Sequence, residues 1–211
     1  MNQILTTFEI IGILAAALSG AMLAIDKRMD LFGVVLIGMV TGLGGGVMRD
    51  VILGHVPRSF SNPAYLAAAV LPPLAVFLIA YILQARYVQE EGLIDRINNI
   101  FDALGLGAFA VGGAAVARAV GYEGHFVVVV FSGVITAVGG GVLRDVLLRE
   151  IPSILKKRVY AIAALVGTLA YYVLLHYGAG EIVSAIGSVL LVFILRILAT
   201  IFHWNFPKAI K

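Results

Sequence analysis

Polar residues divide this chain into seven long apolar stretches, each close to the ~20 residues that cross a bilayer as a helix. The predicted helices cover residues 4–25, 31–53, 63–84, 99–117, 125–148, 159–177 and 182–203. The stretches are continuously apolar, unlike the alternating segments of a membrane β-barrel. Because backbone polar groups inside a bilayer have to be paired within the protein, we predict an all-α membrane protein with seven transmembrane helices.

The composition supports this class. Of the 211 residues, 61% are hydrophobic and 13% are charged, whereas a soluble domain has about 25% charged residues. The mean hydropathy is +1.03. Residues 1–8 contain no Lys or Arg and so lack the basic start of a cleavable signal peptide. We therefore expect the first helix to be retained. The absence of cysteine excludes disulfides and thiolate metal sites.

The basic residues are distributed unequally between the two sides of the predicted bundle. The loops after the first, third and fifth helices, with the C-terminal tail, hold Lys27, Arg28, Arg86, Arg96, Arg149, Lys156, Lys157, Arg158, Lys208 and Lys211. The loops after the second and fourth helices hold only Arg58 and Arg118. The positive-inside rule therefore predicts a cell (inner) membrane protein with its N-terminus outside and its C-terminus in the cytoplasm.

The first half of the chain recurs in the second half. Residues 41–57 and 136–152 are identical at 10 of 17 positions. Further matches, offset by 93 residues, are Phe8 with Phe101, Glu9 with Asp102, Gly12 with Gly105, Ala15 with Ala108 and Gly20 with Gly113. A unit of three helices has to re-enter the membrane from the opposite side, which makes the repeat an inverted one. We predict repeats at 1–97 and 98–179, followed by a seventh helix and tail at 180–211.

Each repeat contains three consecutive glycines inside an apolar stretch. The triplets are Gly44, Gly45 and Gly46, and Gly139, Gly140 and Gly141. Glycine costs roughly 1 kcal/mol relative to alanine inside a helix, so a triplet favours a kink or an unwound turn, and the carbonyls freed by unwinding attract cations. The alternative is close packing between helices. The matched positions of the two triplets favour the break.

An adjacent charge pair follows each triplet, Arg49-Asp50 and Arg144-Asp145. These pairs lie near the far ends of their helices, where they are either interfacial anchors or members of a polar cluster around a pathway. Neighbouring residues on a helix point about 100° apart, so we expect that the two cannot face one partner. Each Asp would instead reach an Arg or a freed amide on a neighbouring helix.

Hydroxyl groups accompany the glycines and charges. Thr41, Gly45 and Arg49 share one helical face, as do Thr136, Gly140 and Arg144. Such a face suits a polar lumen better than lipid, and Ser132 offers a further pore hydroxyl.

The doubled sequences GGGVMRD and GGGVLRD, each with a proline seven positions after its Asp, resemble the prokaryotic relatives of the trimeric intracellular cation (TRIC) channels. That family is also labelled as a bacterial glycine-transporter-like domain. The resemblance covers nearly the whole chain and implies a homotrimer with one pore in each protomer. It implies that the second and fifth helices, kinked at the glycines, line a pore for potassium and other monovalent cations. The lipid binding of the eukaryotic members is not carried over, because their lysine-bearing motif is replaced here by Arg-Asp.

Three further features give weaker signals. Pro72-Pro73 predicts a kink in the third helix or the start of its second half. Arg196 either pairs within the bundle or extends toward the interface. Glu9 and Asp102, each near a predicted helix start, are expected to interact with the helix dipole.

Three classes of function remain open at this stage. In a cation channel, Asp50 and Asp145 would attract cations at the two ends of the pathway, while Arg49 and Arg144 would gate it. A secondary transporter of a small amino acid such as glycine is the alternative, and a structural membrane protein is the third. No catalytic motif, cofactor motif or metal-ligand spacing occurs. The expected partners are monovalent cations such as potassium or sodium, bound transiently, together with membrane lipids and other copies of the chain. Nucleic acid is not expected.

Overall fold

The computed structural model describes residues 3–83, 91–156, 159–202 and 204. Seven helices in this part are long and apolar enough to cross a membrane. They are α1 Gln3–Asp26, α2 Leu31–Ile52, α3 Pro63–Ile82, α5 Glu91–Ala117, α6 Phe126–Leu147, α8 Val159–His176 and α9 Glu181–Ile201. Three short elements complete them: η1 Arg58–Phe60, η2 Arg118–Tyr122 and α7 Ser153–Lys156. The predicted all-α membrane fold is confirmed.

Six of the seven helices begin and end within two residues of their predicted bounds. The exception is α5, which begins at Glu91 rather than at residue 99. Its first two turns mix three charged residues with aliphatic ones, so hydropathy located only the continuously apolar part of the helix. At its other end, α5 continues into the π-helical turn η2, within which Gly121 adopts a positive φ of 102°.

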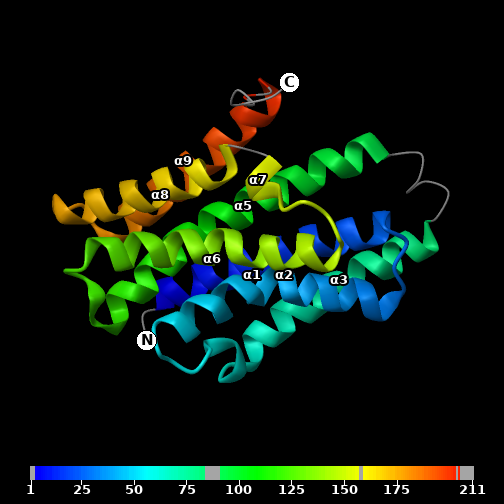
Figure 1. Cartoon of the computed structure of the whole chain (residues 1–211), viewed down its shortest axis with the longest axis horizontal. Coiled ribbons are helices and arrows are strands. Elements are labelled where there is room, and N and C mark those ends of the chain that lie inside the picture. Colours follow the sequence, from blue (N-terminus) through cyan, green and yellow to red (C-terminus); the bar gives the residue numbers. More distant parts are fainter. Residues whose placement is uncertain (1–2, 84–90, 157–158, 203, 205–211) are drawn as a thin grey trace.

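The helices are arranged as two inverted sets of three (Figure 1). Along the bundle, α1, α3 and α6 run in one direction, and α2, α5 and α8 run in the other. Equivalent helices of the two repeats are therefore antiparallel, and α1 packs on α5 while α2 packs on α6. The seventh helix, α9, packs on α5 and α8. The boundaries of the repeats at 1–97, 98–179 and 180–211 stay a prediction.

The glycine triplets lie where α2 and α6 touch. A Cβ atom added at Gly45 would lie 2.1 Å from the carbonyl oxygen of Thr136, and one at Gly140 would lie 2.1 Å from that of Thr41. Both helices continue without interruption through their triplets. The predicted unwound turn is therefore wrong, the alternative of close helix packing is confirmed, and the predicted kink stays a prediction.

Two other glycines make room for the threonines that precede the triplets. A Cβ atom at Gly20 would lie 2.3 Å from the hydroxyl of Thr41, and one at Gly113 would lie 2.4 Å from that of Thr136. Each hydroxyl donates a hydrogen bond of 2.6 Å to the carbonyl four residues earlier in its own helix. Such bonds often bend helices, so any bend in α2 and α6 has a local cause besides glycine.

The two adjacent prolines do not divide α3, which runs from Pro63 to Ile82 through Pro72 and Pro73. A Cβ atom added at Gly38 of α2 would lie 2.3 Å from Cγ of Pro73. The proline ring therefore packs into the space left by this glycine.

Part of the predicted charge asymmetry falls outside the described residues: Arg86, Lys157, Arg158, Lys208 and Lys211. The predicted orientation of the termini stays a prediction.

Replacing Gly45 by Ala is expected to destabilise the protein by about 1–3 kcal/mol, because the new methyl would overlap a backbone carbonyl of α6. Gly46→Ala is the matched control. Its methyl would meet nothing closer than 3.7 Å, so stability is expected to stay equal or rise by up to about 1 kcal/mol. Thermal unfolding of the detergent-solubilised variants measures both, and equal losses would contradict the packing role of Gly45.

Candidate functional site

A first cluster of charged side chains is buried where α2 ends. Arg49 of α2 is only 2% exposed. Its Nη2 lies 2.9 Å from Oε1 of Glu9 on α1 and 2.8 Å from Oδ1 of Asp50. Because α1 and α2 are antiparallel, the second turn of α1 lies beside the last turns of α2. This arrangement brings the three charges together.

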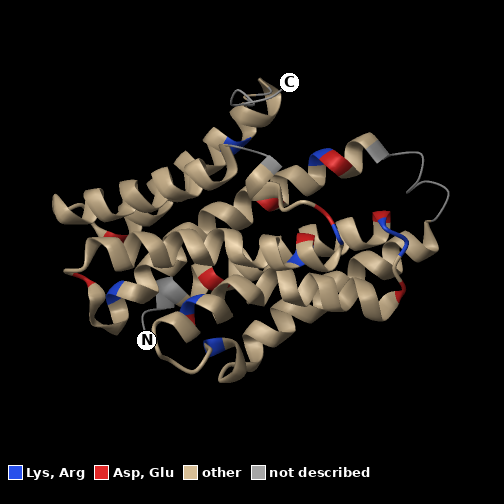
Figure 2. Cartoon of the chain, in the orientation of Figure 1, with Lys and Arg blue, Asp and Glu red and all other residues tan. Residues whose placement is uncertain are grey.

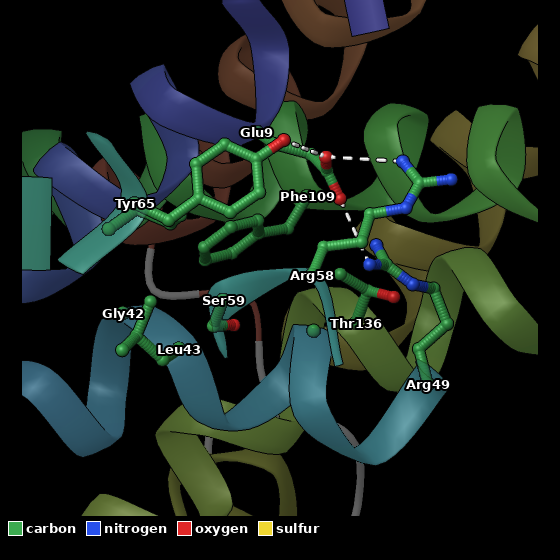
Figure 3. Close-up of a pocket in the computed structure, with 11 residues that line it drawn as sticks. Glu9, Gly42, Leu43, Arg49, Arg58, Ser59, Tyr65, Phe109 and Thr136 are labelled. Atoms are coloured by element: carbon green, nitrogen blue, oxygen red, sulfur yellow. Dashed lines mark hydrogen bonds and ion pairs between the residues drawn. The ribbon is translucent and has the colours of Figure 1, made fainter. Parts of the chain in front are cut away.

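The same cluster is completed by α3 and the loop before it (Figure 3). The hydroxyl of Tyr65 donates a 2.6 Å hydrogen bond to Oε2 of Glu9, and Nη1 of Arg58 lies 3.4 Å from the same oxygen. The backbone N–H of Arg58 donates to Oδ2 of Asp50 at 2.9 Å. All four carboxylate oxygens of Glu9 and Asp50 are therefore paired, as buried charges require.

A second cluster repeats this pattern on the other side of the crossing of α2 and α6. Figure 2 shows charged positions of both signs inside the bundle as well as in its loops. Nε of Arg144 donates to Oδ1 of Asp145 at 2.8 Å, and Oδ2 of Asp145 accepts the backbone N–H of Ser153 at 2.6 Å. Asp102 of α5 lies 3.9 Å from Nη1 of Arg144 and accepts a 3.2 Å hydrogen bond from the hydroxyl of Tyr160. Each residue occupies the position of its counterpart in the first repeat.

One member of the second cluster comes from outside the repeats. Nη2 of Arg196 on α9 lies 3.2 Å from Oδ2 of Asp102, and its guanidinium stacks 4.6 Å from the centre of the Tyr160 ring. Arg196 is 3% exposed, so it pairs within the bundle rather than extending to the interface. Arg196 is the second guanidinium of this cluster, as Arg58 is the second guanidinium of the first cluster. Each cluster thus contains two guanidinium groups and two carboxylates.

Two details of the charged residues differ from the sequence predictions. Arg49 and Asp50 bond to each other, although neighbouring residues diverge on a helix, because the long Arg side chain curves back to the shorter one. Glu9 and Asp102 do not act through a helix dipole: Glu9 forms an ion pair with Arg49, and Asp102 forms one with Arg196. For Asp102 the error has a structural cause: α5 begins at Glu91, which leaves Asp102 well inside the helix.

Each cluster borders a small cavity. The Glu9 cavity has a volume of about 20 Å³ and is lined by Glu9, Ile13, Gly42, Leu43, Gly46, Arg49, Arg58, Ser59, Tyr65, Phe109 and Thr136 (Figure 3). The Asp102 cavity has a volume of about 10 Å³ and is lined by Ala16, Thr41, Asp102, Gly105, Leu106, Phe109, Ala137, Gly141, Arg144 and Tyr160. A cavity needs about 10–15 Å³ to hold one water molecule. Both are therefore close to the size of a single water.

Twelve of the thirteen predicted site residues fall into three structural groups. The cavities are lined by Thr41, Gly46, Arg49, Thr136, Gly141 and Arg144. The contact between α2 and α6 is formed by Gly44, Gly45, Gly139 and Gly140. Asp50 and Asp145 hold the arginines in place. Ser132 is buried in α6, and its carbonyl accepts the hydroxyl of Thr136.

Several residues of the site were missed from the sequence. These are Tyr65, Phe109 and Tyr160, along with the ion-pairing role of Glu9 and Asp102. The tyrosines had a detectable signal, since Tyr65 and Tyr160 are separated by the same 95 residues as the glycine triplets. Among the described residues, no group of three or more His, Asp or Glu is arranged to hold a metal ion.

Seven spanning helices in two inverted repeats, with an Arg–carboxylate cluster in each repeat, define a multi-pass membrane protein of the inverted-repeat class. The family model described as "Glycine transporter" matches residues 6–81 and 99–176, one range in each repeat. The chain belongs to this family, which includes the prokaryotic TRIC channels.

Relatives and solved structures agree with this assignment. The chain is 38% identical to a UPF0126 membrane protein of Deinococcus radiodurans, covering 88% of this chain and 83% of the relative. It is 35% identical to the membrane protein YvgT of Bacillus subtilis, covering 95% and 94%. A prokaryotic TRIC channel solved in 0.5 M KCl superposes with a TM-score of 0.85 at 36% identity, covering 98% and 100%. The TRIC orthologue of Rhodobacter sphaeroides gives 0.84 at 34% identity, covering 96% and 100%.

Substituting Glu9 by Gln is expected to destabilise the protein by about 3–5 kcal/mol, since Arg49 would keep its buried charge and lose a partner. Lys27→Ala removes an ion pair whose two side chains are 47% and 40% exposed, so it is expected to cost at most about 1 kcal/mol. Denaturation of both variants in the same detergent tests the contrast. A Glu9→Gln loss as small as that of Lys27→Ala would show that Arg49 is well solvated.

Proposed function

We propose that the protein is a channel for monovalent cations, with potassium as the main ion, and that each protomer contains its own pore. The observation that carries this proposal is the match to solved TRIC cation channels along nearly the whole chain. The site supports it, because both cavities and both charged clusters are built from side chains of a single chain. The pore would be lined by α2 and α6, kinked near their glycines, with contributions from α1 and α5.

The pathway would run from one charged cluster to the other through the two cavities. A fixed guanidinium repels cations unless it is neutralised, and each cluster balances its two guanidinium groups with two carboxylates. The threonine hydroxyls and cavity-lining glycines then provide polar surface between the ends. In this proposal, Asp50 and Asp145 favour cations mainly because they neutralise the adjacent arginines, which would otherwise repel a cation.

Arg49 and Arg144 would act as gates. Both are buried, and each borders one of the two small cavities. Volumes of about 20 and 10 Å³ leave no room for a hydrated potassium ion, which supports a closed state. Opening would require each guanidinium to leave its position while its carboxylates remain.

The assembly would be a homotrimer, since the solved relative of Rhodobacter sphaeroides is described as trimeric. Its outer surface would contact membrane lipids. A relative in Escherichia coli, 38% identical over 78% of this chain, is named an inner membrane protein. We extend that location to this chain, with its N-terminus outside and its C-terminus in the cytoplasm.

Glycine transport is the second candidate, because the family model carries that description and inverted repeats also occur in transporters. A transporter would have to alternate the access of a central substrate site. The four carboxylates of the clusters are instead held in ion pairs. The channel remains the better-supported function.

Purified protein in liposomes is expected to pass potassium down its gradient, at a rate that rises linearly with concentration. Potassium release and radiolabelled glycine uptake, measured on the same vesicles, separate the two functions. Saturable glycine uptake without potassium release would favour the transporter and exclude the channel.

Removing the charges of Arg49 and of its partner Glu9 is expected to raise potassium flux several-fold, since a guanidinium no longer borders the Glu9 cavity. The double variant Glu9→Gln/Arg49→Gln removes one negative and one positive charge, so the cluster stays neutral overall, with Asp50 and Arg58 as its remaining charges. Arg49→Lys, which keeps the charge, serves as the control and should conduct like the parent protein. Gating by Arg49 is excluded if the double variant and the parent protein conduct equally.

A further inference from the structure

We propose that the ring of Phe109 is an apolar plug that separates the Glu9 cavity from the Asp102 cavity. The plug would be the constriction that a cation and its water have to pass at the centre of each pore. This inference deepens the proposed channel function and rests on it.

Among the residues that the structure describes, only Phe109 lines both cavities. It lies on α5, is 5% exposed and belongs to the main apolar core. Figure 3 shows its ring in the wall of the Glu9 cavity, close to Tyr65. Two further buried apolar side chains extend the layer, Ile13 beside the Glu9 cavity and Leu106 beside the Asp102 cavity. Apolar groups thus lie between two polar compartments.

The repeat shows that this ring is an addition to the symmetric design. By the offset of 93 residues, the counterpart of Phe109 is Ala16 on α1. Ala16 lines only the Asp102 cavity, and its small side chain cannot divide it from its neighbour. An aromatic ring therefore lies on one side of the symmetry axis, and only a methyl group lies on the other.

Gly12 provides the space for the ring. A Cβ atom added at Gly12 would lie 2.6 Å from both Cδ1 and Cε1 of Phe109, closer than real side chains approach. At the counterpart, Gly105, an added Cβ would meet the backbone nitrogen of Ala16 at 3.3 Å. Gly12 thus leaves space for the Phe109 ring in the first repeat, whereas Gly105 lies against Ala16 in the second.

Polar groups on either side favour water right up to the ring. Nη1 of Arg49 is buried without a hydrogen-bond partner in the described structure, and it borders a cavity of the size of one water molecule. On the other side, the Asp102 cavity is bordered by a carboxylate, a guanidinium and a threonine hydroxyl. A narrow apolar layer between hydrated compartments blocks ions by excluding water, which is how hydrophobic gates act.

The test is potassium flux through the full-length protein in liposomes. Phe109→Ala is expected to raise the flux by about threefold or more, because water can then connect the two cavities. Phe101→Ala is the matched control. It makes the same change two turns earlier on α5, at a residue that lines neither cavity, and it should leave the flux unchanged. Size-exclusion profiles of both variants check that the assembly is intact.

The outcomes separate this inference from the channel function. If the parent protein conducts and Phe109→Ala conducts no faster than Phe101→Ala, the plug is wrong and the channel stands. If neither the parent protein nor any variant passes potassium, the channel is wrong and the plug falls with it. Should Phe109→Ala fail to assemble, Phe109→Thr replaces it. Threonine is smaller and carries a hydroxyl like those already lining the cavities, so flux equal to that of the parent protein would again overturn the plug.

Discussion

The contact between the backbones of α2 and α6 determines where the rest of the site lies. Gly45 and Gly140 let each helix approach a carbonyl oxygen of the other, in a reciprocal pair that follows the inverted repeat. Since each arginine comes four residues after its glycine on the same helix, this crossing also fixes the depth of Arg49 and Arg144. The two charged clusters therefore lie on opposite sides of the crossing, each about one helical turn from it, and a side chain larger than glycine at the crossing would move both.

Much of the fold could be predicted from the sequence because its signals are long and repeated. Apolar stretches located seven helices, and the recurrence of the glycine triplets revealed the inversion. The role of the triplets could not be decided in the same way. The same glycine triplet can serve either an unwound turn or the close approach of two helices. Only the position of Thr136 opposite Gly45 in the folded chain distinguishes the two.

The candidate site was predicted in part for a similar reason. Arg49 and Asp50 stand out because charges are rare in an apolar segment, whereas Glu9 lies near the start of its helix, where an acidic residue is ordinary. Tyrosine is still less conspicuous in a membrane helix. Partners that belong to different helices are recognised only once the helices are packed. The offset between the repeats also changes along the chain, from 93 residues at Glu9 to 95 at Tyr65. A search at a single offset therefore does not match both residues with their counterparts.

Arg196 and Phe109 make the two halves of the molecule unequal. The first cluster is built within one repeat, but the second depends on α9, which has no counterpart. A pathway made of two identical inverted halves would present the same profile to ions entering from either side of the membrane. In the proposed channel, the order of barriers would reverse with the direction of ion flow, so currents of unequal size at opposite voltages would follow from this asymmetry.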